Sequence, residues 1–246
     1  MEPVRSTRNP RVTAAARLRR ARERKRLGLT LLEGPHLLEE ALAAGAEVLE
    51  VFGLGSPQPA VPNWVEVTED VLIRLADTES PRGPVAVMRI PPAVTATRDH
   101  LVLGVSDPGN AGTLIRTAAA FGLDVAFGSD AVDPWSPKVL RAAAGSHFRT
   151  VIGDRVRDAA TIATVVKGGV AARDLGTVLD PARRWAILVG SEAHGLSDDE
   201  VAAADVQVTI PMPGGTESLN AAVAGAIVAY ELALWRNAAG GVISNR

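Results

Sequence analysis

Residues 11–90 alternate short apolar runs with stretches in which apolar residues recur at helical spacing. Gly, Pro or charged residues separate these segments, as expected at the ends of helices and strands. This alternation is typical of a small α/β domain. The expected helices span residues 11–26, 35–44 and 69–76, and the expected strands span residues 29–33, 48–52, 64–67 and 84–90.

The strand pattern restarts after the consecutive prolines Pro91 and Pro92. Adjacent prolines favour an extended, semi-rigid chain, so we place a linker here, between one domain in residues 1–92 and a second in residues 97–246. In the second domain, strands again alternate with helical stretches, which predicts a mostly parallel sheet covered by helices. These strands are expected at residues 101–105, 125–127, 151–152, 170–172, 186–189 and 206–210.

The last predicted helix, residues 219–235, is rich in Ala and Gly and is apolar nearly all round. A surface helix normally keeps one polar face, so packing must cover several faces of this one. A dimer interface would provide that cover.

Composition excludes several classes of protein. With 246 residues and 47% hydrophobic content, the chain can bury one large core or two modest ones. It contains no Cys, and its four His show no paired ligand spacing, so we expect neither disulfides nor a bound metal. No apolar run approaches the roughly 20 residues of a membrane-spanning helix, and the basic N-terminus lacks the apolar core of a signal peptide. We therefore expect a cytoplasmic protein without a membrane partner.

Charge is distributed unevenly, although the formal net charge is only -2. Residues 5–26 contain ten Lys and Arg against the single acid Glu23. In the predicted helix, Arg17, Arg20 and Arg24 share one face. Clustered guanidinium groups favour binding to RNA phosphates, and a solvated helix or a mobile arm is the alternative interpretation.

Three motifs follow strands of the second domain, in residues 107–117, 188–196 and 210–220. Each contains Gly that lets the backbone approach a ligand, and open α/β sheets bind ligands at the carboxyl ends of their strands. Taken singly, each motif has an ordinary explanation, because Asn110 or Ser218 could cap a helix and Arg116 could form a surface ion pair. Their joint occurrence in this order favours one shared site.

In this order the motifs resemble the signature sequences of the SpoU (TrmH-like) branch of SPOUT methyltransferases. The resemblance implies transfer of a methyl group from S-adenosylmethionine to a ribose 2′-hydroxyl in RNA. It also implies an α/β catalytic domain with a C-terminal trefoil knot, a homodimer formed through that domain, and a small α/β substrate-binding domain before it. General rules of chain connection would exclude a knot, and here the resemblance outweighs them.

Motif positions carry the family's residue roles over to this chain. An arginine is effectively never deprotonated in a protein, so we expect Arg116 to position a phosphate or to stabilise the developing alkoxide, in its own protomer or its partner's. The resemblance implies catalytic roles for Asn110, Arg116, Glu192, Ser218 and Asn220, and cofactor contacts for Gly190, Ile210, Met212 and Leu219. The candidate RNA contacts are Arg5, Arg8, Arg11, Arg17, Arg20, Arg24, Lys138 and Arg141.

A full substrate-binding domain favours ribosomal RNA, most of all that of the large subunit, over transfer RNA. Three alternatives stay open: a transfer-RNA 2′-O-methyltransferase, an antibiotic-resistance methyltransferase acting on ribosomal RNA, and a catalytically silent RNA-binding assembly factor. The intact set of five catalytic positions argues against the silent protein. The sequence does not identify the modified nucleotide, because such selection depends on RNA shape and on contacts spread over a surface.

Overall fold

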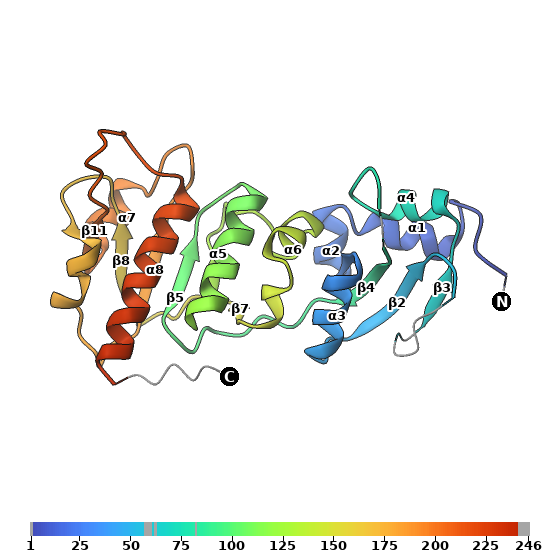
Figure 1. The fold of residues 1–246 in the computed structure, drawn as a ribbon, viewed down its shortest axis with the longest axis horizontal. Coiled ribbons are helices and arrows are strands. Elements are labelled where there is room, and N and C mark those ends of the chain that lie inside the picture. Colours follow the sequence, from blue (N-terminus) through green and yellow to red (C-terminus); the bar gives the residue numbers. More distant parts are fainter. Residues whose placement is uncertain (1, 57–60, 62, 82, 241–246) are drawn as a thin grey trace. The chain divides into compact units, whose positions relative to one another are not determined.

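The computed structural model describes residues 2–56, 61, 63–81 and 83–240, and Figure 1 labels most of the helices and many of the strands. Contacts divide the chain into two compact units. The N-terminal unit combines the residues up to Pro92 with Asp133–Phe148, and the C-terminal unit combines Ala93–Val132 with the residues from Arg149 onward. The segment Asp133–Phe148, which lies in the second domain of the sequence-based division, therefore belongs to the first unit in space.

The N-terminal unit is built on a four-stranded sheet in the order β1-β4-β2-β3. Its strands are β1 (Leu29–Glu33), β2 (Val48–Gly53), β3 (Trp64–Glu66) and β4 (Val85–Arg89). Strand β4 runs antiparallel to β1 and β2, and β2 runs parallel to β3. The four expected strands all form, but β4 is inserted between β1 and β2, so the sheet is mixed.

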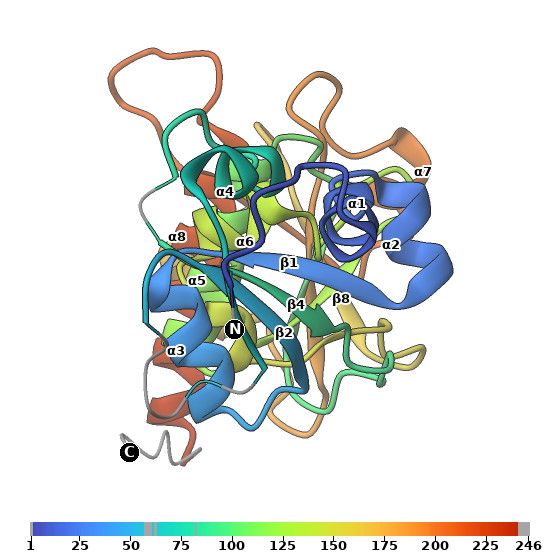
Figure 2. The same ribbon diagram turned by 90° about the vertical axis from the view of Figure 1, so that its right-hand side faces the viewer.

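Four helices cover the two faces of this sheet: α1 (Pro10–Arg17), α3 (Pro35–Ala43), α4 (Glu69–Leu75) and α6 (Pro137–Ala143). Successive strand residues point to opposite faces. Leu31 and Phe52 pack in a buried cluster with α1 and α4, whereas Leu32 and Val51 pack in a second cluster with α3 and Leu140 of α6. Figure 2 shows α1 and α4 on one side of the strands and α3 on the other.

The basic N-terminal helix expected over residues 11–26 is two helices, α1 and α2 (Ala21–Leu27). The chain turns between them because Leu18 is buried in the core and Arg24 is directed inward. The guanidinium of Arg24 donates to the carbonyl of Leu18 at 2.8 Å, to that of Arg19 at 2.9 Å, and to Asp133. The expectation that Arg17, Arg20 and Arg24 share one exposed face is therefore wrong, since Arg24 is 4% exposed.

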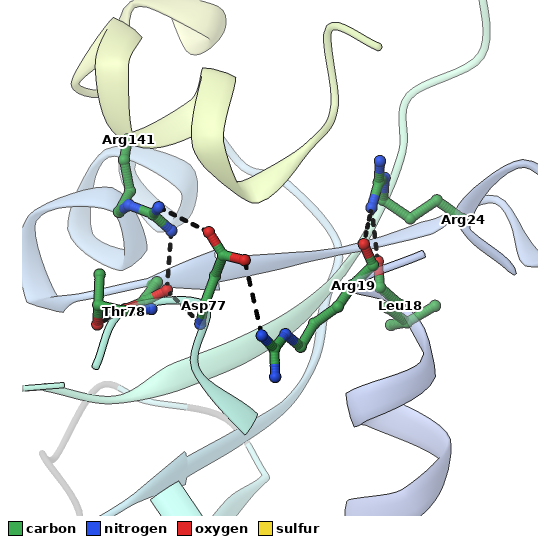
Figure 3. Close-up of polar contacts among 7 residues, drawn as sticks. Leu18, Arg19, Arg24, Asp77, Thr78 and Arg141 are labelled. Carbon is green, nitrogen blue, oxygen red and sulfur yellow. Dashed lines mark hydrogen bonds and ion pairs between the residues drawn. The ribbon is translucent and has the colours of Figure 1, made fainter. Parts of the chain in front are cut away.

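The segment Asp133–Phe148 completes the N-terminal unit through α6 and polar contacts. Arg141 donates to Glu33 at 2.9 Å and to Asp77 at 2.8 Å, and Thr30 donates to the carbonyl of Trp135 at 2.6 Å. Figure 3 shows Arg141 directed at Asp77, and Arg24 directed at the backbone of Leu18 and Arg19. Two arginines thus link Asp133–Phe148 to the rest of this unit.

The C-terminal unit contains a seven-stranded sheet in the order β7-β6-β5-β10-β8-β11-β9, in which every neighbouring pair is parallel. The predicted parallel sheet is therefore confirmed. Its strands are β5 (His100–Leu103), β6 (Asp124–Phe127), β7 (Ile152–Gly153), β8 (Ala160–Thr164), β9 (Val170–Ala171), β10 (Trp185–Val189) and β11 (Val206–Thr209).

Strand β8, which lies between β10 and β11 in the sheet, was not predicted from the sequence. Ile162 is the only large apolar residue in this five-residue strand, so the local pattern predicts a loop. In the central strands, Leu103 of β5 pairs with Val189 of β10. This register brings the loops that follow the two strands to the same edge of the sheet.

Helices α5 (Pro108–Phe121) and α8 (Ala221–Ala238) pack side by side on the sheet (Figure 1). A Cβ on Gly225 would lie 2.7 Å from Leu114 and 2.9 Å from Val189, so this close approach needs a residue without a side chain. The first residue of α8 is Ala221, two positions later than expected. Within the described residues, no helix is long and apolar enough to cross a membrane.

Candidate active site

The loops that follow β5 and β10 meet at the side chain of Glu192. Its Oε2 accepts hydrogen bonds from the backbone N–H and the hydroxyl of Ser106, each at 3.1 Å. Its Oε1 accepts from the N–H of Asp107 at 3.2 Å and from Nδ2 of Asn110 at 2.8 Å. Four donors therefore hold both oxygens of one carboxylate and join the first motif to the second.

Asn110 extends this contact to the third motif. Its Oδ1 accepts a hydrogen bond from Nδ2 of Asn220 at 3.0 Å. Asn220 also caps α8, because its Oδ1 accepts from the N–H groups of Ala222 at 2.8 Å and Val223 at 3.2 Å.

The cap of α5 is Asp107, whose Oδ1 accepts from the N–H of Asn110 at 2.8 Å. Since Asp107 and Asn220 provide the caps, neither Asn110 nor Ser218 does, and the side chain of Asn110 is available to join Glu192 and Asn220.

The carboxyl group of Glu192 is held in its ionised form. Partial burial by itself would raise its pKa, because removing water disfavours the charged form. The hydrogen bonds from Asn110 and from the backbone N–H groups of Glu192, Ser106 and Asp107 act in the opposite direction and lower the pKa to about 2. Glu192 is therefore a fixed negative charge at neutral pH and is a poor candidate for a group that takes up a proton.

A first cavity of about 530 Å³ lies beside these residues, at the ends of β8, β10 and β11 and the start of α8. Glu192, Ser218 and Asn220 line it, together with the apolar side chains of Val189 and Val208. All four residues expected to contact a cofactor also line this cavity, namely Gly190, Ile210, Met212 and Leu219.

Gly190 stands where the chain leaves β10 and turns sharply. The N–H of Ser191 donates to the carbonyl of Gly195 at 3.1 Å, and the N–H of Gly195 donates back to the carbonyl of Ser191 at 2.9 Å. A Cβ on Gly190 would lie 2.1 Å from the carbonyl carbon of Gly195, so no other residue fits this position. The closed turn keeps Glu192 at the edge of the first cavity.

The five predicted catalytic residues are thus only partly assembled by one chain. Asn110, Glu192 and Asn220 are joined by hydrogen bonds, and Ser218 lines the first cavity without capping the helix. Arg116 is exposed on α5, does not line the cavity, and has no hydrogen bond or ion pair to any residue that the structure describes. Its guanidinium is therefore available for a partner outside the described chain.

Ser106 and Asp107 were absent from the set of expected catalytic residues, although they supply three of the four donors to Glu192. The available signal was their position directly after the predicted strand 101–105, where ligand-binding residues of parallel sheets are found.

Among the described residues, no group of three or more His, Asp or Glu is placed to hold a metal ion.

The candidate RNA contacts of the N-terminal unit separate into two groups. Arg11 is paired with Glu50, Arg24 with Asp133, and Arg141 with Glu33 and Asp77. The remaining basic side chains are exposed and form no ion pair within the part of the chain that the structure describes. They are Arg5, Arg8, Arg17, Arg20 and Lys138.

Comparison with known proteins identifies the family. The model of the "SpoU rRNA Methylase family" matches residues 100–230, which is more than half of the chain. The chain belongs to the SpoU rRNA methylase family. The resemblance carried by the three motifs is thereby confirmed. In this SpoU-family protein, a second model, the "MRM3-like substrate binding domain", matches residues 9–86.

Several relatives of this SpoU-family protein resemble it over almost the whole chain. The 23S rRNA (guanosine(2553)-2′-O)-methyltransferase RlmP of Bacillus subtilis is 32% identical over 94% of this chain and 99% of its own. The 23S rRNA (adenosine(1067)-2′-O)-methyltransferase of Streptomyces azureus is 30% identical over 85% of this chain and 87% of its own. The SpoU methyltransferase AviRb from Streptomyces viridochromogenes, solved with the cofactor AdoMet, is 26% identical, with a TM-score of 0.78 over 97% of this chain and 100% of that one.

The first cavity suits S-adenosylmethionine, the group that membership in this family implies. Its volume of about 530 Å³ lies within the range of roughly 300–1,000 Å³ found for small-molecule sites. Apolar side chains such as Val189, Val208 and Val228 suit an adenine ring. The ionised carboxylate of Glu192 at its edge suits a ligand that carries positive charge.

Proposed function

We propose that this SpoU-family chain transfers the methyl group of S-adenosylmethionine to a ribose 2′-hydroxyl in RNA, with ribosomal RNA of the large subunit as the substrate. The observation that carries the proposal is the hydrogen-bonded series Glu192–Asn110–Asn220 at the edge of the first cavity. Two relatives of similar length that are named as 23S rRNA 2′-O-methyltransferases support the same reaction.

The cofactor supplies an activated methyl group on a positively charged sulfur, so the protein needs neither a metal nor a covalent intermediate. The residues that would hold the cofactor line the first cavity, namely Gly190, Ile210, Met212 and Leu219. In-line attack requires the hydroxyl and the methyl group to be aligned, and alignment of this kind is the main contribution that a protein makes to such a transfer.

Asn110, Glu192 and Asn220 provide a rigid edge for that alignment. The four donors on Glu192 keep its carboxylate in place, and the carboxylate in turn fixes which end of the Asn110 amide faces Asn220. Ser218, which is exposed in the cavity wall, is free to donate a hydrogen bond to the ribose. Arg116 contributes a permanent positive charge that positions a phosphate or stabilises the developing alkoxide.

A homodimer is part of this proposal. Helix α8 exposes Val223, Tyr230 and Leu234 to between 45% and 47%, and their spacing places them on one side of the helix. A second copy of the chain would cover these apolar side chains and would bring a site close to Arg116, which has no partner among the residues that the structure describes. A C-terminal trefoil knot belongs to the same proposal, supported by the insertion of β10 between the earlier strands β5 and β8.

Ribosomal RNA is favoured over transfer RNA because the match to an MRM3-like substrate binding domain covers residues 9–86. The exposed Arg5, Arg8, Arg17 and Arg20 in and beside this segment suit RNA phosphates. The relatives do not indicate one target base, since the two named above are named for a guanosine and for an adenosine at similar identity to this chain.

The test is transfer of labelled methyl from S-adenosylmethionine to unmodified transcripts of 23S rRNA, 16S rRNA and transfer RNA, followed by nucleoside analysis. Transcripts are needed because RNA from cells can already carry the modification. A 2′-O-methylated nucleoside in 23S rRNA is the expected product. A product in transfer RNA alone would make the substrate assignment wrong. Binding of S-adenosylmethionine without transfer to any RNA would favour the silent RNA-binding protein.

A further inference from the structure

A second cavity of about 480 Å³ lies within the C-terminal unit, at the carboxyl ends of β5, β6 and β10. The loop after β10 and the beginning of α7 (Asp198–Ala203) form one wall. The segments that follow β5 and β6 form the rest, and they contribute Ser106, Ser129, Asp130 and Ala131. None of the motif residues to which the proposed function gives a catalytic role lines this cavity.

The two cavities have a wall in common. Gly190, Ser191 and His194 line both of them. Glu192 lines only the first cavity and Ser106 only the second, and the Ser106 hydroxyl donates to Glu192 at 3.1 Å. A ligand in one cavity and a ligand in the other would therefore approach each other at this hydrogen bond.

The second cavity combines apolar and polar walls. Val102 and Leu188 supply apolar surface from the sheet. Arg155 and His194 line the cavity, and the side chain of neither forms a hydrogen bond or ion pair with any described residue. Asp130 is exposed, and among the described residues its side chain receives a single, long hydrogen bond of 3.4 Å from Ser129. Unpaired donors and an acceptor around an apolar surface suit a flat heteroaromatic ring with polar edges.

We propose that the second cavity binds the nucleobase of the nucleotide that is methylated, after this nucleotide has turned out of the RNA strand. The inference rests on the proposed function. The base and the 2′-hydroxyl are attached to adjacent carbons of one ribose, so a hydroxyl at the first cavity places its base in the neighbouring space. Sequence-specific RNA recognition uses unpaired bases that turn out of the strand, stack on side chains and form hydrogen bonds at their edges.

Arg155 is the residue that gives this site its preference for an RNA ligand. A guanidinium can donate to the edge of a base or to the adjoining phosphate, and it can also stack on a ring. Asp130 provides an acceptor from the segment after β6. The nearby Arg157 is exposed and does not line the cavity, which makes it a matched control for the loss of one arginine.

The first experiment measures binding of the four ribonucleoside 5′-monophosphates to the full chain saturated with S-adenosylhomocysteine, by equilibrium dialysis. Saturation fills the first cavity, so bound nucleotide reports the second one. We expect dissociation constants of about 1 mM with unequal affinities among the four bases. Arg155→Ala should weaken nucleotide binding about tenfold, because the loss of one hydrogen bond to a charged group lowers affinity by at least this factor. Arg157→Ala should leave nucleotide binding unchanged.

Three results would overturn the inference. The first is that nucleotides do not bind at about 10 mM, a concentration well above the expected dissociation constant. The second is that S-adenosylhomocysteine displaces the nucleotides, which would place both ligands in one continuous site. The third is that the Arg155→Ala variant binds nucleotides as tightly as the unchanged chain.

A second experiment separates this inference from the proposed function. The variant Ala131→Trp places a large side chain at the edge of the second cavity, and we expect it to raise KM for RNA about tenfold. Its dissociation constant for S-adenosylmethionine should stay the same. If the unchanged chain methylates RNA while neither Arg155→Ala nor Ala131→Trp alters KM for RNA, the inference fails alone. If the unchanged chain binds nucleotides but transfers no methyl, the proposed function fails.

Discussion

The amide of Asn110 donates to the carboxylate of Glu192 at 2.8 Å across a separation of 82 residues in the chain. This single contact joins the loop after β5 to the loop after β10. Because Asn220 donates to the same Asn110 side chain, the contact also reaches the start of α8. The edge of the first cavity is therefore one connected structure, and a change at Glu192 should be felt by Asn110 and Asn220.

Replacing Glu192 with Gln should lower methyl transfer while the protein stays folded. A carboxylate accepts at both oxygens, whereas the amide NH2 of Gln would face N–H groups of Ser106, Asp107 or Asn110. Losing a hydrogen bond to a charged group costs about 1.5–3 kcal/mol, which corresponds to a fall of about 10- to 100-fold in kcat. Single-turnover kinetics would measure it. The control is Asp199→Asn on the exposed surface of α7, and equal activity of both variants would contradict the role of Glu192.

Replacing Arg141 with Met should destabilise the N-terminal unit. Arg141 balances the charges of Glu33, whose side chain is 7% exposed, and Asp77. Breaking a buried ion pair is costly because the remaining charge is left without a partner, and we expect a loss of about 2 kcal/mol after allowing for the partial exposure of Arg141. Denaturant unfolding would measure the change. Arg173→Met, which removes an exposed ion pair with Asp174, should lower the free energy of unfolding far less. Similar losses of stability in the two variants would contradict the structural role of Arg141.

Acid should destabilise the N-terminal unit through His147. Burial lowers the pKa of this imidazole from 6.5 to about 4, against a smaller opposing effect of its contact with the Pro134 carbonyl. Between these two values the folded ring is neutral while the unfolded ring takes up a proton. Stability is therefore lost as the pH falls from 6.5 towards 4, by about 3 kcal/mol in total.

Denaturant unfolding at a series of pH values would test this prediction. The variant His147→Phe should flatten the dependence over that range, because its ring does not titrate. His36→Phe removes an exposed imidazole and serves as the control. If the His147 variant keeps the full slope of the unchanged chain, another group is responsible.

Removing the charges of Arg17 and Arg20 together should weaken RNA binding and reduce its salt dependence. Both guanidinium groups are exposed and unpaired among the described residues, unlike Arg24. Each phosphate contact contributes a slope of about 0.7–0.9 in log K against log salt, so the double variant to Gln should lose about 1.5. Filter binding at several salt concentrations would measure it. A double change to Gln at Arg157 and Lys167 is the control, and an unchanged slope in the Arg17 and Arg20 variant would remove this segment from the RNA interface.

Placing Asp at Tyr230 and Leu234 should abolish the homodimer. Both side chains are exposed on α8, at 47% and 45%, and an interface that covers them would have to bury two unpaired carboxylates. Sedimentation velocity would show a monomer for the double variant and a dimer for the unchanged chain. Val178→Asp, at another exposed apolar position, should remain dimeric. A monomeric unchanged chain would contradict the proposal directly.

Local patterns in the sequence were sufficient for much of the fold. Every strand except β8, together with the parallel arrangement of the second sheet, follows from apolar runs bounded by Gly, Pro and charged residues, since these signals act over a few neighbouring positions. The three motifs and their order were also sufficient to identify the family. The strand β8 was missed because its small side chains depend on neighbouring strands for their burial.

The contacts between distant residues could not be predicted from local patterns. No local spacing indicates that α6 belongs with the N-terminal sheet or that Arg24 is buried against Asp133, because each of these contacts joins segments about a hundred residues apart. The same holds for Ser106 and Glu192, and for the second cavity that lies beside them. Local patterns were enough for the periodic elements and for the motifs, because these signals act over neighbouring positions. Packing between remote segments placed Asn110, Glu192 and Asn220 together and used Arg24 and Arg141 to hold the fold.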